Sequence, residues 1–270
     1  MTHTNRARRT LPGLTVGLAS WLFATTLPAK EYKSGELIST NRFGFGAFEA
    51  RLQAAAGPGV ISTFFLWKPG SELPSVPWEE IDFELGIRSS DLQTQIMTPG
   101  DIPPLYRMEH VTKLDLAERP WNDFHTYRME WTPSYIAFFI DGVEVRRETD
   151  AEEYATLFNT NGNGDTPDSE RMELRMGVWP GAPNISAWSG DFDGSSVPTA
   201  LFVDYVTVWD YSPSASLPFS TVLMHDDFDN PPTQRWYTAN WTFEFSASDY
   251  VPQNVALEAR KPHRGPHGRG

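Results

Sequence analysis

The sequence predicts an all-β fold, a sandwich or jelly roll of many short strands. Short segments alternate polar and apolar residues, or run through β-branched and aromatic ones, as strands do. Aromatic residues make up 13% of the chain, and they favour strands. The 20 glycines and 22 prolines cluster between these segments, where turns are expected. At 270 residues, the chain is long enough for one all-β domain with a sizeable core.

The expected strands follow one another along almost the whole chain. They cover residues 35–40, 46–53, 60–67, 80–85, 92–97, 124–132, 135–148, 173–179 and 201–209. Gly44 and Gly46 mark the first turn, and Asp141-Gly142 is a hairpin signal inside the longest segment. The one helix that we expect is short and covers residues 150–157.

The N-terminal segment resembles a signal peptide. Three arginines precede a mostly apolar run, residues 11–27, which ends in Pro28-Ala29. The run is short for a membrane span and contains a proline and a glycine, so cleavage is favoured over an uncleaved anchor. We therefore expect residues 1–29 to be removed and the mature protein to be secreted or periplasmic, with no membrane association.

The rest of the chain is expected to form one domain, residues 30–260. Residues 211–220 read as a linker, but the piece after it is small for an independent domain without cysteine. We expect that piece to add strands to the main body. The basic, glycine- and proline-rich end, residues 261–270, is expected to be a disordered tail.

Composition excludes several classes of function. The net charge of −13 argues against a nucleic-acid partner, which needs a basic surface. The absence of cysteine excludes disulfides, thiolate catalysis and cysteine metal sites. An acidic protein is compatible with a neutral polymer as substrate. The aromatic residues suit either a β-rich core or the flat faces of a sugar-binding cleft.

One expected strand carries three acids. Alternate side chains of a strand share a face, so Glu80, Asp82 and Glu84 lie on one face. Ile81, Phe83 and Leu85 lie on the other, and Glu79 shares their face. Mutual repulsion is expected to raise the pKa of at least one of the three acids. The alternative is a solvated strand face with surface acids.

Such a row suits acid/base chemistry on a glycosidic bond. A retaining glycosidase needs two carboxyl groups about 5–5.5 Å apart. Residues four apart on a strand are about 13 Å apart at Cα, so Glu80 and Glu84 must lean together on a curved sheet. The intervening Asp82 can hydrogen-bond an outer acid and keep the two in different protonation states.

The strand EIDFE, residues 80–84, resembles the Glu-x-Asp-x-Glu active-site strand of family 16 glycoside hydrolases. Its regular spacing is more similar to lichenases (β-1,3-1,4-glucanases) and xyloglucan transglycosylases than to laminarinases. Further segments resemble lichenases in order along the chain: SGELIST (34–40), FGAFEAR (45–51), FHTY with EWTP (124–133) and IDG (140–142).

The order of one segment is unusual. DDFD at residues 226–229 and the stretch 235–243 resemble the start of an ordinary lichenase, yet here they come last. This resemblance implies a natural circular permutation, with the old ends joined near residues 211–220. Domain termini often lie close together, so a permuted order is physically tolerable.

The resemblance implies a concanavalin A-like jelly roll of two curved antiparallel sheets, with the cleft on the concave face. It implies retaining endo-hydrolysis, with Glu80 as nucleophile, Glu84 as general acid/base and Asp82 as helper. It places substrate-binding side chains at Glu36, Phe65, Trp67, Gln93, Gln95, Trp179, Trp188 and Trp241. It implies no cofactor for catalysis, and a structural calcium at Asp204 in some members. For each tryptophan, core packing is the alternative.

The expected protein is therefore a secreted, monomeric endo-β-glucanase that hydrolyses mixed-linkage β-1,3-1,4-glucan. The sequence Val178-Trp179-Pro180-Gly181 departs from the lichenase pattern and is more similar to cell-wall transglycosylases of the same family. A β-glucan transglycosylase or an endo-1,3-β-glucanase on the same strand is therefore the alternative. A non-catalytic sugar-binding jelly roll is a third possibility, against which three intact carboxylates argue.

Overall fold

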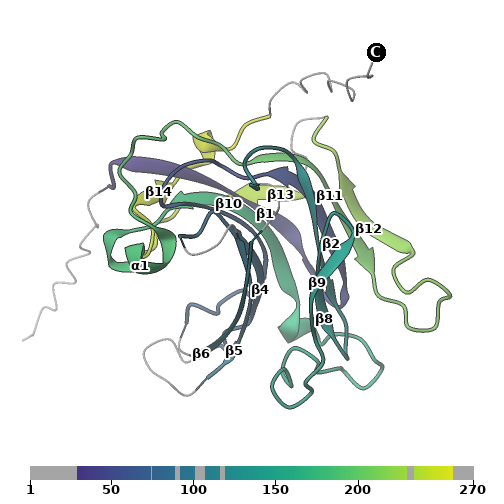
Figure 1. Ribbon diagram of the computed structural model, residues 1–270. Helices are drawn as coiled ribbons and strands as arrows, with labels where there is room; N and C mark the ends of the chain where they lie inside the picture. The colour runs from purple at the N-terminus through teal and green to yellow at the C-terminus, as the bar shows by residue number, and fades with distance from the viewer. Residues whose placement is uncertain are drawn as a thin grey trace, which may run out of the picture.

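The computed structural model describes residues 29–73, 75–88, 92–100, 107–115, 119–229 and 234–257. Within these ranges the chain forms two β-sheets that pack face to face (Figure 1). The all-β jelly-roll fold expected from the sequence is confirmed. The expected signal peptide, apart from Ala29, and the expected tail lie outside the described residues. No helix in the described ranges is long and apolar enough to cross a membrane.

The first sheet has eight strands in the described part of the chain. Across the sheet, the order is β13 (Trp236–Thr238), β1 (Tyr32–Phe43), β10 (Met172–Pro180), β3 (Val60–Trp67), β4 (Glu80–Leu85), β5 (Leu92–Pro99) and β6 (Arg107–Leu114). A short strand, β14 (Ser248–Tyr250), pairs with β1 in the parallel direction. The acidic strand β4 thus lies inside this sheet, with paired strands on both sides.

The second sheet has six strands in the described ranges. Their order is β12 (Thr221–Asp226), β11 (Phe202–Asp210), β2 (Gly46–Gln53), β7 (His125–Trp131), β8 (Ile136–Ile140) and β9 (Val143–Glu148). The helical segments are each of one turn or less: α1 (Ser186–Ser189), η1 (Asp168–Glu170), η2 (Pro183–Ile185) and η3 (Pro252–Asn254).

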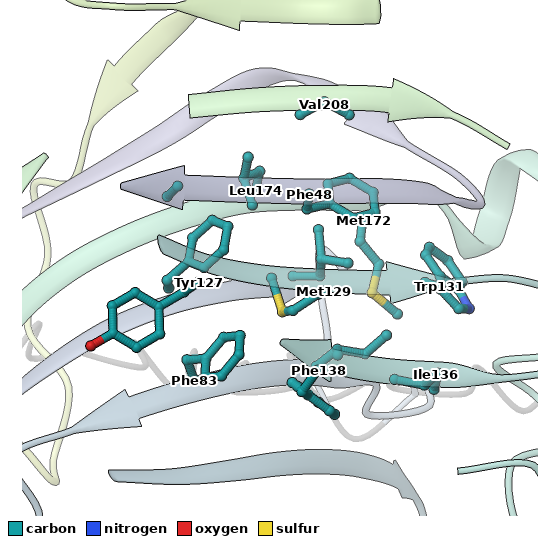
Figure 2. Packing of buried hydrophobic residues seen from close by; sticks show 14 of the residues in the cluster. Phe48, Phe83, Tyr127, Met129, Trp131, Ile136, Phe138, Met172, Leu174 and Val208 are labelled. Carbon is teal, nitrogen blue, oxygen red and sulfur yellow. The ribbon is translucent and has the colours of Figure 1, made fainter. Parts of the chain in front are cut away.

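The core lies between the sheets and fixes which way β4 faces. Ile81, Phe83 and Leu85 are completely buried in it. The Phe83 ring meets Tyr127 of β7 at 5.3 Å and Phe138 of β8 at 5.2 Å between centroids, edge to face (Figure 2). Burial of these apolar side chains stabilises this orientation of the strand. Because a strand alternates, the acids of β4 must then project from the opposite face of the sheet.

The C-terminal piece contributes to both sheets. Strand β12 pairs with β11 of the second sheet, and β13 and β14 both pair with β1 of the first. Residues 211–220 form the connection between β11 and β12. The segment that the sequence places last therefore lies beside the strand that opens the described domain.

Two local expectations differ from the structure. The prediction of a helix over residues 150–157 is wrong. This segment forms turns, with single hydrogen bonds such as that from Tyr154 N to Asp150 O. The reason is that Tyr154 and Leu157 are buried in the core and hold the loop against the sheets, so packing overrides helix propensity. Strand β6 was not expected, because RMEHVTKL, which belongs to an outermost strand, carries too few apolar residues to give the strand pattern.

Candidate active site

A cleft of about 1140 Å³ runs over the face of the first sheet that points away from the core. All eleven residues expected to carry chemistry or bind sugar line it. They are Glu36, Phe65, Trp67, Glu80, Asp82, Glu84, Gln93, Gln95, Trp179, Trp188 and Trp241. The expectation that the three acids face an open groove, and Glu79 does not, is therefore confirmed by the geometry.

Strand register places each acid beside a defined pair of neighbours. Glu84 lies between Thr63 of β3 and Gln93 of β5. Asp82 lies in the same way between Phe65 and Gln95. Cross-strand neighbours are about 5 Å apart. The two glutamines therefore place amide groups directly beside the acids.

Glu80 occupies the third position of the row, between Trp67 of β3 and Met97 of β5. The indole Nε1 of Trp78 donates a hydrogen bond to Glu80 Oε2 at 3.0 Å. Trp78 meets the Trp67 ring edge to face at 5.3 Å. Sequence reasoning missed Trp78, although it is only two residues from Glu80 and belongs to the same segment. The contact orients the Glu80 carboxylate at one end of the acidic row.

Glu84 is held by a chain of hydrogen bonds at the other end of the row. Gln93 Nε2 donates to Glu84 Oε2 and also to Gln95 Oε1. Gln93 Oε1 accepts a hydrogen bond from Trp188 Nε1 at 3.2 Å. Trp188 belongs to helix α1, so this chain joins the helix, β5 and β4. The two outer acids are therefore contacted by different side chains, Glu80 by Trp78 and Glu84 by Gln93.

A buried ion pair lies beside the acids on β1 and β10. Glu36 Oε1 lies 3.3 Å from Arg175 Nη1, and Tyr250 hydrogen-bonds the same carboxyl group. Burial raises the pKa of Glu36 to about 7, although Arg175 opposes the shift; the negative charge of Glu80 raises it further. Arg175 also pairs with Glu173 at 2.7 Å. A carboxyl group poised near neutral pH thus lies in the wall of the cleft.

Aromatic rings cover the side of the cleft nearest β1 and β10. Trp179 stacks on Trp188 with centroids 6.0 Å apart and meets Phe243 at 5.0 Å. The Arg175 guanidinium lies over Trp67 at 5.3 Å and over Trp241 at 5.6 Å. Flat faces beside fixed polar groups are suited to the apolar faces and hydroxyl groups of sugar rings.

Several lining residues were missed from the sequence. They are Trp78, Glu109, Val111, Lys113, Arg175, Tyr237, Phe243, Phe245 and Tyr250. Alternation would have identified Arg175, because it shares a strand face with Trp179, which had been singled out. No sequence signal pointed to β6, and the C-terminal aromatics depend on contacts between distant segments. The opposite side of the cleft, on β5 and β6, is more polar, with Gln93, Gln95 and Lys113.

Glu79 projects from β4's other side, as expected, and is almost completely buried there. It pairs with Lys68 Nζ at 2.8 Å, and Lys68 also contacts Glu170. Lys68 N donates a backbone hydrogen bond to Glu79 O. This ion cluster fastens the ends of β3 and β4 where Glu80 enters the cleft, and Glu79 itself does not line it.

Asp204 lies on β11 in the second sheet, away from the cleft. Its Oδ2 is 2.9 Å from Arg51 Nη1. Calcium takes six to eight oxygen ligands, and the described residues contain no group of three or more histidine or acidic side chains placed to hold a metal ion. The described side chains around Asp204 therefore do not make up a calcium site by themselves, and calcium binding stays a prediction.

The sequence matches the family model of glycosyl hydrolases family 16 over residues 19–209. A β-glucanase of Fibrobacter succinogenes is 32% identical over 246 residues, which are 90% of this chain and 66% of that protein. A β-glucanase of Acetivibrio thermocellus is 34% identical over 176 residues, 65% of this chain and 45% of that protein. This chain thus spans less than two thirds of the length of these curated relatives. Crh-like protein 1 of Aspergillus fumigatus is 28% identical over 193 residues, 69% of this chain and 49% of that protein.

Solved structures with similar folds include two from these groups. A Bacillus licheniformis β-glucanase superposes with a TM-score of 0.46 at 22% identity, covering 62% of this chain and 66% of that chain. The apo Crh5 transglycosylase superposes with a TM-score of 0.47 at 26% identity, covering 65% of this chain and 67% of that one.

Proposed function

Because the chain belongs to glycosyl hydrolases family 16, we propose that it is an endo-β-glucanase that cleaves mixed-linkage β-1,3-1,4-glucan with retention of configuration. Relatives named β-glucanase support a glycosidase. The observation that carries the proposal is the row of Glu80, Asp82 and Glu84 along the floor of the cleft. Aromatic faces and amides beside the row suit a neutral polysaccharide better than a charged one.

In the proposed mechanism, Glu80 attacks the anomeric carbon and forms a glycosyl-enzyme, while protonated Glu84 gives its proton to the leaving oxygen. The same carboxylate, now ionised, removes a proton from a water molecule that attacks the anomeric carbon and releases Glu80. Asp82 lies between them on β4, and in this mechanism its electrostatic coupling to the outer acids separates their protonation states. The long cleft binds several sugar units, so short substrates are expected to react poorly.

The decisive experiment replaces each outer acid. Glu80→Gln and Glu84→Gln should each lower kcat on barley β-glucan by at least about 10³-fold while leaving the unfolding temperature near the parent's. Glu152→Gln, at an exposed acid, should change neither. Azide should rescue Glu80→Ala and give a glycosyl azide of inverted configuration. Near-parental turnover in Glu80→Gln or Glu84→Gln would disprove the assignment.

Substrate identity needs its own measurement. A panel of barley glucan, laminarin and xyloglucan, read for reducing ends, should show the fastest release from barley glucan. A preference for laminarin would instead support an endo-1,3-β-glucanase. Binding to every polymer without release of reducing ends would leave a non-catalytic sugar-binding protein.

A β-glucan transglycosylase is the second candidate. It is favoured by the sequence Val178-Trp179-Pro180-Gly181, of which Trp179 lines the cleft, and by the similarity to Crh-like protein 1. Both reactions use the same three acids and differ in whether water or a sugar hydroxyl releases the glycosyl-enzyme. Incubation with an oligosaccharide acceptor separates them, because chains longer than the donor indicate transfer and shorter chains alone indicate hydrolysis.

We also propose that the domain is circularly permuted, with its joint near residues 211–220. The family match ends at residue 209, just before the joint. The two ends of the domain are adjacent, since Lys30 N lies 2.8 Å from Asp249 Oδ2 and Asn254 Nδ2 donates to Lys33 O. A gene that joins residue 257 to residue 30 through a short linker and opens at 215 should give a folded protein. Failure to fold would count against the permutation.

Three further proposals concern the mature protein. Cleavage after Ala29 and export are proposed from the signal-like N-terminus and are tested by N-terminal mass determination of exported protein. A monomeric state is proposed separately and is tested by light scattering. Structural calcium at Asp204 is tested by unfolding in calcium and in chelator. A calcium-dependent rise in Tm that Asp204→Asn abolishes would support it, and equal Tm values would refute it.

A further inference from the structure

One wall of the cleft is a turn from the C-terminal piece, residues 243–246. Phe243 and Phe245 both line the cleft. The Phe243 ring meets Trp179 at 5.0 Å and stacks on Tyr250 with centroids 6.1 Å apart and planes 6° from parallel. The position of this turn therefore determines where the rings of Phe243 and Phe245 lie in the wall of the cleft.

The turn is fastened to the end of β10 and the residues that follow it by neutral backbone contacts on one side. Ala182 N donates to Phe245 O at 2.7 Å, and Ala247 N donates to Pro180 O at 2.8 Å. Within the turn, Ser246 N donates to Phe243 O at 3.3 Å, which is long for such a bond. The internal closure of the turn is therefore weak, and other contacts must help to hold it.

A lysine more than two hundred residues away in the sequence supplies such a contact. Lys30 Nζ donates to Phe243 O at 2.6 Å and to Ser246 O at 2.5 Å, so one ammonium group joins the two ends of the turn. Hydrogen bonds from a charged donor are shorter and about twice as strong as neutral ones.

The lysine is itself fixed in place. Its backbone N donates to Asp249 Oδ2 at 2.8 Å, and Asp249 also accepts from Lys33 Nζ at 2.7 Å. Asp249 and Thr242 face each other in an antiparallel bridge that closes the base of the same loop. Burial lowers the pKa of Lys30 and the Asp249 charge opposes this. Lys30 is thus held in place at both its backbone nitrogen and its ammonium group.

We propose that Lys30 is a positioning residue of the cleft: its ammonium clamps the turn 243–246 and thereby fixes Phe243 against Trp179 for sugar binding. The inference deepens the proposed function and rests on it for the ligand. Lys30 touches neither the acids nor the cleft, since it is absent from the residues that line it. Its effect is on binding rather than on the chemical step.

The test compares Lys30→Met with Lys33→Met. Lys30→Met keeps the aliphatic stem and removes the ammonium that contacts the turn. Lys33→Met removes the neighbouring ammonium, which donates to Asp249 and to Lys30 O, and leaves both hydrogen bonds of Lys30 Nζ to the turn in place. Hydrogen exchange of the amides of residues 243–247 should accelerate by at least about tenfold in Lys30→Met and stay near the parent's rate in Lys33→Met. Lys30→Arg, which keeps the charge, should retain protection. Unchanged exchange in Lys30→Met would overturn the clamp.

Binding gives the second readout. In a Glu80→Gln background, a mixed-linkage glucan tetrasaccharide is titrated into the protein and binding is followed by tryptophan fluorescence. Adding Lys30→Met should raise the Kd roughly three- to tenfold. With active enzyme, KM should rise similarly and kcat should stay within about twofold of the parent's. Faster exchange with an unchanged Kd would overturn the positioning role. If the parent binds no glucan oligosaccharide, the proposed function fails, while hydrogen exchange still decides the clamp.

Discussion

Gln93 connects the acid at one end of the acidic row to the aromatic wall, because its amide donates to Glu84 and accepts from Trp188. An indole N–H is only a donor, so it must face the amide oxygen of Gln93. The amide nitrogen is thereby turned toward Glu84. The orientation of a group that touches the proposed general acid is thus determined by a tryptophan on another element.

The first prediction is that this connection supports turnover. Gln93→Leu removes the donor beside Glu84 and should lower kcat on barley β-glucan by roughly 10–100-fold. Trp188→Phe keeps a ring for stacking but loses the N–H that orients the amide, so we expect a smaller loss, roughly three- to tenfold. Gln53→Leu, whose amide donates to the backbone oxygen of Trp121 in the loop before β7, is the matched control and should keep parental kcat. Parental kcat in Gln93→Leu would contradict the role.

The second prediction concerns the other face of the same strand. Phe83 is completely buried against Tyr127 and Phe138, so Phe83→Ala should lower the free energy of unfolding by about 3–5 kcal/mol. Denaturant unfolding measures the loss. Val143→Ala, at a largely exposed position, should cost less than about 0.5 kcal/mol. A small effect of Phe83→Ala would mean that the core does not anchor β4.

The sequence was sufficient to predict features that repeat along one strand. Ile81 and Phe83 alternate with Glu80, Asp82 and Glu84, so the period of the strand assigns a core face and a cleft face before any partner is known. The expected cleft residues are likewise on strands with clear alternation or in segments similar to lichenases.

Features that depend on distant pairing could not be predicted in this way. Glu36, Arg175 and Tyr250 meet because β1 pairs with both β10 and β14. No local pattern shows that a carboxyl group and a guanidinium group 139 residues apart will be buried together. The prediction of a helix over residues 150–157 is wrong for a related reason, since the conformation of this segment depends on where Tyr154 is buried.

The third prediction concerns the pH dependence of stability, and its origin is Glu36. In the folded protein the pKa of Glu36 is about 7, because burial outweighs the attraction of Arg175, whereas in the unfolded chain it returns to about 4.3. Between these values the folded state keeps the proton and the unfolded state releases it. Stability therefore falls as pH rises through this window, by up to about 4 kcal/mol, and the loss is complete above pH 7.

Urea unfolding at pH 4.5, 5.5, 6.5 and 7.5 measures this contribution as the difference between the parent and Glu36→Gln. Glutamine does not ionise, so the free energy of unfolding of Glu36→Gln should lack this decline. Relative to the parent, the variant should therefore become more stable with each step to higher pH. For Glu152→Gln, at an exposed acid, the free energy of unfolding should change with pH in parallel with that of the parent. Because the Glu80 charge raises the pKa of Glu36, Glu80→Gln should move the decline to lower pH. Parallel curves for the parent and Glu36→Gln would show that Glu36 ionises normally.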